Sequence, residues 1–377
     1  MNSGKEYRVR SRRIFLLSCA PLLFAAGAVF AQSEIDKLKE RIDALEVETR
    51  LNKEDYDALL EELEGKIKIG GYVDLEYTQD SRDQIKPGFR IHHFSLFFKQ
   101  KISERWRFFS EIEYEDGPSF DFRDGLTAGA GKIFVEAVNF DYEYKPELIV
   151  RGGRFFTPAG IWSVDHYPPF VPTQERPLHI RKIFPQIIDG LMTYGTHSVG
   201  SVIARYEGYV GNGEGNDDEG KEDDNTRKSY GVKISLLPIT MQYLDFGASY
   251  YSDRRADNGQ EIDAAGLHAK LRLGSATFQG EYATGDIKTV SGSSFTRSGY
   301  YAQLMYDIDT WTVGGRHDIY ESDDTLNVEE TRKTAFINHH VSANVVLKLE
   351  HHIHEYENPA QQDYNLSIAS IAYYLAE

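Results

Sequence analysis

Five basic side chains gather between residues 151 and 182 of a chain whose formal net charge is −17. Guanidinium and ammonium groups held together bind anions and repel cations. Only two carboxylates, Asp165 and Glu175, lie in the same stretch, so its formal charge is +3 in an otherwise acidic protein. The stretch is therefore predicted to bind anions. Its candidate residues are Arg151, Arg154, Arg176, Arg181 and Lys182.

Histidines are the second group with chemical potential, because imidazole binds metals and exchanges protons near neutral pH. They occur as His92-His93, as His339-His340 and within the run 351–354. Neighbouring residues of a strand point to opposite faces, and no carboxylate stands at the spacing of a recognised metal site. We interpret these histidines as polar residues of an interior or an interface, and we expect no metal site and no cofactor.

Catalytic motifs are not found in the sequence. Sequence alone singles out no Ser, His and orienting acid, and there is no glycine-rich phosphate loop or metalloprotease helix. The protein is therefore not expected to be an enzyme. Its acidic balance also argues against a nucleic-acid partner, because phosphate backbones require basic surfaces.

The elements that position these residues follow one repeated pattern from about residue 66 to the C-terminus. Runs of some ten residues alternate apolar or aromatic with polar side chains, which is the period of a β-strand. In the run 267–273, for example, apolar residues alternate with His268, Lys270 and Arg272. A soluble β-sandwich also alternates in this way, so the pattern alone does not establish a membrane protein.

Composition and strand number favour a membrane barrel. Aromatic residues make up 13% of the chain, and transmembrane barrels place such rings at both membrane interfaces. No stretch after residue 31 reaches the ~20 apolar residues of a spanning helix, so any membrane embedding requires closed β-structure. We predict sixteen antiparallel strands, an even number that encloses a water-filled channel. They lie near 67–78, 89–101, 105–115, 132–144, 147–155, 189–196, 199–210, 228–237, 242–252, 262–273, 276–284, 297–307, 311–320, 333–341, 343–355 and 364–376.

One segment interrupts the strands. Residues 156–188 contain six of the twelve prolines of the chain, and a central strand does not tolerate proline. So long a connection is unusual in a compact domain and indicates a functional insertion. Folded inward, it would narrow the channel and place the basic residues at the constriction.

The N-terminus carries an export signal. Five basic residues precede the apolar stretch 14–30, and cleavage after Ala31 would lower the formal charge to −21. Two other interpretations stay open: residues 11–16 resemble a twin-arginine motif for folded cargo, and Cys19 resembles a lipoprotein site. Cys19 is the only cysteine, so the mature chain would contain no disulfide.

Between signal and strands, residues 32–65 are rich in charge. Ile35, Leu38, Ile42 and Leu45 occupy heptad positions that predict a short periplasmic coiled-coil helix. A solvated amphipathic helix is the alternative, because so few heptads are marginal on their own. The pattern does not predict a trimer, since Ile at a with Leu at d is more usual in two-stranded coils.

Three short motifs resemble the phosphate-selective porin O and P family. They are Gly-Arg-Phe-Phe-Thr-Pro-Ala-Gly-Ile at 153–161, Glu-Arg-Pro at 175–177 and Asp-Gly-Leu-Met-Thr-Tyr-Gly at 189–195. The layout of signal, helix and barrel is also similar. The resemblance implies a sixteen-stranded homotrimeric channel in the outer membrane of a Gram-negative bacterium, with a ladder of basic residues at its constriction.

The sequence thus predicts an all-β protein: signal peptide 1–31, periplasmic coiled-coil helix 32–65, and transmembrane β-barrel 66–377 with constriction loop 156–188. The first hypothesis for its function is passive diffusion of small hydrophilic solutes, above all anions such as phosphate, through a pore embedded in outer-membrane lipid. The alternatives are a general or cation-preferring porin, a non-conducting structural or adhesive barrel, and a soluble periplasmic β-protein.

Overall fold

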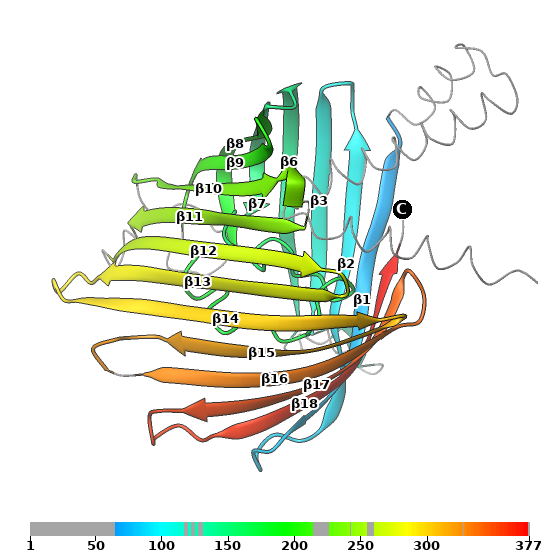
Figure 1. The fold of residues 1–377 in the computed structure, drawn as a ribbon, viewed down its shortest axis with the longest axis vertical. Helices are drawn as coiled ribbons and strands as arrows, with labels where there is room; N and C mark the ends of the chain where they lie inside the picture. Colours follow the sequence, from blue (N-terminus) through cyan, green and yellow to red (C-terminus); the bar gives the residue numbers. More distant parts are fainter. Residues whose placement is uncertain are drawn as a thin grey trace, which may run out of the picture.

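A closed antiparallel sheet of sixteen strands forms the protein (Figure 1). The computed structural model describes residues 65–116, 120–121, 125–126, 131–213, 226–241, 243–254, 260–326 and 328–375. The barrel strands are β1 (Ile67–Asp80), β2 (Gly88–Lys101), β3 (Trp106–Glu115), β6 (Lys132–Lys145), β7 (Leu148–Phe156), β8 (Ile187–Val199), β9 (Val202–Gly211), β10 (Ser229–Pro238), β11 (Leu244–Arg254), β12 (Glu261–Leu273), β13 (Ala276–Lys288), β14 (Ser294–Ile308), β15 (Trp311–Glu321), β16 (Glu329–His340), β17 (Val345–Tyr356) and β18 (Tyr364–Leu375).

Each strand pairs with its neighbour in sequence, and β1 closes the barrel by pairing with β18. Short connections such as 146–147, 200–201 and 274–275 lie on one rim, and longer ones lie on the opposite rim. Two further elements are small: β4 (Phe120–Asp121) pairs with β5 (Gly125–Leu126), and the 3-10 helix η1 (Ile239–Met241) follows β10. The prediction of a sixteen-stranded barrel is confirmed, with most strand ends within a few residues of those expected.

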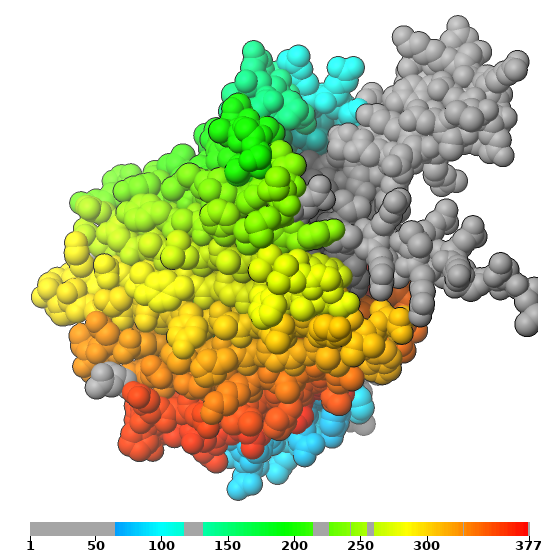
Figure 2. All heavy atoms as spheres, viewed as in Figure 1, coloured from blue at the N-terminus to red at the C-terminus, as the bar shows by residue number. Residues whose placement is uncertain are grey.

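The barrel is apolar outside and polar inside. Along β17, Leu349 is 55% exposed on the outer wall, whereas its neighbour Glu350 is 1% exposed. Lys348 and His352 share the inner face with Glu350. Figure 2 shows the outer side chains of the later strands forming one continuous wall. A soluble sandwich buries its apolar side chains, whereas this barrel carries them on its outer surface, as expected for a wall surrounded by lipid.

Residues 1–64 lie outside the described residues. The predicted signal peptide and coiled-coil helix therefore stay predictions. Within the described ranges, no helix is long and apolar enough to cross a membrane.

The long connection between β7 and β8, residues 157–186, folds into the barrel, and we call it the inserted loop. In Figure 1 its green trace lies behind β12 to β14, on their inner side. Phe184 and other loop residues belong to an apolar cluster with inward side chains of strands between β7 and β15. Tyr167 and Val164 pack against Tyr72 and Phe97 on the opposite wall. Trp162, 1% exposed, packs with Val171, Ile180 and Tyr301.

Apolar contacts therefore fix the loop to two parts of the wall. A fully buried large apolar side chain stabilises a fold by roughly 1.5–3 kcal/mol. In residues 157–186, which are described without a gap, Phe170 and Lys182 are the most exposed, the Arg181 side chain is partly exposed, and most of the others are buried. The proline-rich segment thus packs against the inner side of the barrel wall, while its role as a constriction stays a prediction.

The outer wall provides a first prediction. Replacing Leu349, near the middle of β17, with arginine should destabilise the barrel in lipid by about 2–4 kcal/mol, because a charge near the bilayer midplane is costly. Denaturant unfolding in vesicles, followed by tryptophan fluorescence, measures the change. Leu326→Arg in the connection between β15 and β16 is the control and should change stability by less than ~0.5 kcal/mol. Equal effects of both substitutions would argue against a lipid-facing wall.

Candidate functional site

Side chains of the polar inner wall hold the inserted loop by hydrogen bonds, many of them to its backbone groups, which need partners away from water. Several strands supply them: Lys233 Nζ of β10, for example, donates to the carbonyl of Gly160 at 2.6 Å, and β15 to β17 supply others. Three side chains from three strands donate to consecutive loop residues. Arg316 Nη1 donates to Thr173 Oγ1 at 2.6 Å, Asn338 Nδ2 to the carbonyl of Pro172 at 2.8 Å, and Lys348 Nζ to the carbonyl of Val171 at 2.7 Å.

Asp318 on β15 is the centre of this contact. Its carboxylate accepts from Arg316 Nε at 2.9 Å and from the backbone N–H of Leu178 at 3.3 Å. Arg332 Nε on β16 lies 3.4 Å from the same group, and Arg332 also donates to the carbonyl of Arg176. Both arginines and Asp318 are almost completely buried. Buried charges are stable only when they are paired with opposite charges and fully hydrogen-bonded.

The opposite wall is acidic. Glu111 and Glu113 on β3 and Glu136 on β6 are buried close together. The inserted loop meets them with Tyr167, whose hydroxyl donates to Glu111 at 2.9 Å, and with Arg181, 3.7 Å from Glu136. The inserted loop therefore lies between a wall rich in arginine and a wall rich in glutamate.

Solvent exposure separates the two signs of charge around the inserted loop. In three ion pairs the side chain of the cation is more exposed than that of the carboxylate. They are Arg90 and Glu76 (38% and 0% side-chain exposure), Arg181 and Glu136 (32% and 8%), and Lys182 and Glu330 (41% and 15%). The fourth pair, Arg332 and Glu175, has the reverse order, at 2% and 35%.

Four of the five predicted anion-binding residues lie inside the barrel. Arg176, Arg181 and Lys182 belong to the inserted loop, and the Lys182 ammonium also lies 4.4 Å from the centre of the Tyr320 ring. Arg151 is on the inner face of β7, where it pairs with Asp141. The Arg151 guanidinium is buried and neutralised there, so it is set apart from the exposed loop cations.

Arg154 does not join the other four, and that part of the prediction is wrong. It pairs in the sheet with Val138 and Asp189, and it shares the outward face of β7 with Val150. On that face its guanidinium binds Asp189 at 2.7 Å. The spacing from Arg151 already contained the signal, because residues three apart on a strand point to opposite sides.

Desolvation shifts the pKa of several loop groups. It lowers the pKa of Arg176 to about 10, with the nearby charge of Arg181 as the next cause. It also lowers the pKa of Lys182. Burial raises the pKa of Asp165 to about 6, against the opposing influence of Lys270 and Lys233. The interior thus disfavours isolated charge of either sign.

Sequence reasoning missed the wall residues that hold the loop. Arg316 and Asp318 stand two apart on β15, and Lys348, Glu350 and His352 repeat that spacing on β17. Charged residues at every second position mark the lumen face once a strand belongs to a barrel. The alternation of these charged residues could therefore have placed them in the lumen, although it does not show which loop residues they contact.

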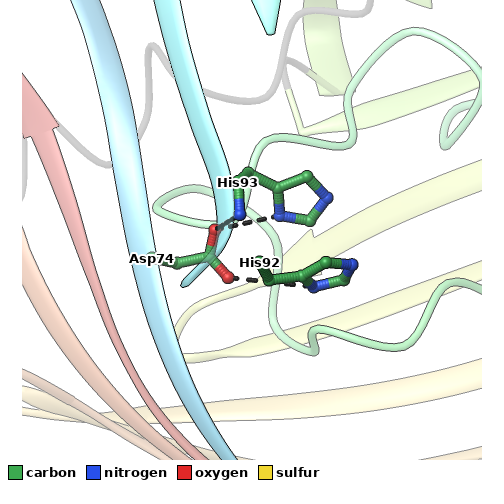
Figure 3. A group of neighbouring side chains, drawn as sticks. All are labelled: Asp74, His92 and His93. Carbon is green, nitrogen blue, oxygen red and sulfur yellow. Dashed lines mark hydrogen bonds and ion pairs between the residues drawn. The ribbon is translucent and has the colours of Figure 1, made fainter. Parts of the chain in front are cut away.

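The expectation that adjacent histidines face opposite ways is wrong for His92 and His93. A β-bulge opposite Asp74 and Leu75 inserts an extra residue into β2, and both rings then lie on the inner side. Figure 3 shows the two rings side by side, next to Asp74 of β1. Their centres are 3.7 Å apart.

A closed sixteen-stranded barrel with an apolar outer wall, a charged lumen and a loop folded inside defines a porin-type barrel of the outer membrane. Residues 192–359, from β8 to just beyond β17, match the family model described as Gram-negative porin. This match and the fold indicate a channel rather than an enzyme, and they place the protein in the outer membrane. The porin-type barrel that the resemblance implies is thus supported, whereas membership of the phosphate-selective porin O and P family stays a prediction.

Known proteins show the same fold. An anion-selective porin from Comamonas acidovorans aligns with 82% of this chain and 99% of its own, at 11% identity and a TM-score of 0.62. The trimer form of OmpT, an outer membrane protein of Vibrio cholerae, aligns over 82% and 99% at 11% identity and a TM-score of 0.57. At such identities the likeness concerns the fold alone.

A protein of Aquifex aeolicus (strain VF5) described as uncharacterized is also similar. It is 31% identical over 149 residues, which are 39% of this chain and 32% of that protein. The chain thus matches only about a third of the length of this relative.

The Asp318 contact provides a second prediction. Asp318→Asn leaves Arg316 and Arg332 buried without their shared carboxylate, a change that typically costs about 3–5 kcal/mol. We expect the inserted loop to undock, seen as faster amide hydrogen exchange around Leu178. Glu355→Gln, which removes a solvent-exposed ion pair with Lys333, is the control and should cost less than ~1 kcal/mol. Unchanged exchange at Leu178 would show that the loop stays docked without the Asp318 carboxylate.

Proposed function

We propose that this protein is a passive channel for small hydrophilic solutes with a preference for anions, phosphate among them. The observation that carries the proposal is the exposure of Arg90, Arg181 and Lys182 above more deeply buried carboxylates. A solute in the lumen comes closer to the exposed cation than to the buried carboxylate behind it. The local potential near the loop is therefore positive although the whole chain is acidic.

The buried carboxylates also limit how tightly an anion binds. Each exposed cation is already partly neutralised by its partner, so an anion gains only part of the attraction of a free charge. Conduction requires this balance, because a solute must enter readily and also leave. The arrangement fits a weakly selective passage better than strict phosphate selectivity. No energy source and no cofactor enters this proposal.

Assembly and export complete the proposal. We propose a homotrimer, supported by the shared barrel fold and by the family resemblance. Residues 1–31 act as a signal peptide and residues 32–65 as a periplasmic coiled-coil helix. The charged, heptad-bearing sequence of the second segment supports this, since barrels side by side would bring such helices together.

A third prediction tests the anion preference. Arg181→Gln combined with Lys182→Gln should lower the anion-to-cation permeability ratio about fivefold or more, because a unit charge at 4 Å in water is worth ~1 kcal/mol. The reversal potential of the purified protein in a planar bilayer under a KCl gradient measures it. Arg154→Gln is the matched control, since its side chain lies on the outer wall and should leave the ratio unchanged.

An unchanged reversal potential in the double variant would remove Arg181 and Lys182 from the selectivity filter. A wild-type potential on the cation side would instead identify a cation-preferring channel. Phosphate titration at constant ionic strength then separates a phosphate-binding channel, whose chloride current falls, from a general one.

A non-conducting structural barrel is the second candidate, favoured by the depth to which the inserted loop is packed. Both sides of the loop contact the wall, and its backbone is hydrogen-bonded to strands β15 to β17. Absence of current steps in wild type, with steps appearing in Asp318→Asn, would support this candidate.

A further inference from the structure

The β2 bulge creates a cluster in the lumen that the channel proposal does not use. His92 and His93 lie on one side of β2, with Asp74 of β1 beside them (Figure 3). One nitrogen of each ring and one oxygen of the carboxylate lie within 4.8 Å of one another. We propose that these three side chains bind a divalent transition-metal ion of the Zn²⁺ class.

The donor set suits such an ion. Two imidazoles with a carboxylate are ligands that Zn²⁺ takes in proteins, with bonds of roughly 2.0–2.2 Å. Ligand atoms at that distance around a tetrahedral ion lie about 3.3 Å apart. The Asp74 carboxylate lies 2.9 Å from His93 Nδ1 and 4.0 Å from His92 Nδ1, values on either side of that separation. Small side-chain rotations are enough to close the site.

Neighbouring groups orient the ligands. The backbone N–H of His93 donates to Asp74 Oδ1 at 3.0 Å, which fixes the carboxylate against β2. Glu76 Oε1 lies 2.9 Å from His92 Nδ1 and is a second carboxylate within reach. Arg90 competes at 3.4 Å from the same nitrogen, but its guanidinium also pairs with Glu76 and Asp116. Because Glu76 approaches the same His92 nitrogen that lies near Asp74, it is a candidate fourth ligand and not a group that orients the ring through its other nitrogen.

A second observation comes from the inserted loop. Gln174 Nε2 donates to Asp74 Oδ2 at 3.1 Å, so the amide lies at the cluster. Its Oε1 is buried and has no hydrogen-bond partner among the residues that the structure describes. A buried acceptor without a donor is costly, whereas a metal-bound water would supply one. The site therefore joins the inserted loop to the wall of β1 and β2.

This inference does not depend on anion preference or on conduction. The test is Zn²⁺ binding by the full-length protein, purified in detergent and freed of metal with a chelator, using a competing chromophoric chelator as readout. We expect one Zn²⁺ per chain in the wild type. His92→Ala with His93→Ala should weaken binding at least ~10–100-fold, and Asp74→Asn should weaken it to a smaller extent.

His339→Ala with His351→Ala is the matched control. These histidines lie on the outward parity of β16 and β17, and their removal should leave Zn²⁺ affinity unchanged. Failure of the wild type to retain Zn²⁺ would overturn the proposal. Equal binding by the His92/His93 variant would also overturn it and would point to the buried Glu111, Glu113 and Glu136 instead.

A measurement on the wild type guards against misfolding of the variants. Diethylpyrocarbonate modifies accessible imidazoles, and mass spectrometry locates the products. Added Zn²⁺ should protect His92, the more exposed of the two rings, while His351 reacts at an unchanged rate. Equal modification of His92 with and without Zn²⁺ would contradict the site.

Discussion

Lipid offers no hydrogen-bond partner to a backbone, and this constraint determines the rest of the structure. A sheet that crosses the membrane must pair every strand on both sides, so β1 is joined to β18 and the sheet has no free edge. Closure then decides the chemistry of the side chains. Alternate residues of each strand face lipid and are apolar, and the others face an enclosed volume wide enough to hold water and charge.

The inserted loop, inside the barrel, also needs hydrogen-bond partners for its backbone. Prolines interrupt this segment at six positions, and because each lacks a backbone N–H the segment cannot form a regular strand of the sheet. It is held instead by side chains of the wall, as when Lys348 donates to the carbonyl of Val171 and Asp318 accepts from the N–H of Leu178. The wall charges that perform this task are buried, whereas the cations exposed to the lumen are Arg90, Arg181 and Lys182. Support of the loop and the proposed selectivity therefore rest on different residues.

Local patterns explain how much of this was predictable. The alternation around Leu349 and Glu350 and the prolines of 156–188 each lie within a few residues, so the strands and the inward loop could be predicted from sequence. The partners of the loop could not, because Gln174 and Glu350 meet only after sixteen strands have taken their register. Strand parity relative to Arg151 would have placed Arg154 outside the lumen, so the sequence contained the information that excludes Arg154 from the site.

Bulges account for the part of the site that no alternation predicts. In β2 the extra residue turns His92 and His93 to the same side, and in β6 a second irregularity, opposite Glu111 and Ile112, leaves Glu136 and Ala137 both buried. Each bulge thus adds one polar side chain to a lumen face that regular pairing would have spaced more widely. Both groups of three close metal-binding side chains found among the described residues, at Asp74 and at Glu111, lie at these bulges. A regular barrel spaces its inward side chains evenly and makes a smooth charged passage. In this chain a concentration of several ligands at one point occurs where the regular pairing is interrupted, on β2 and β6, the two strands that flank β3 in the wall.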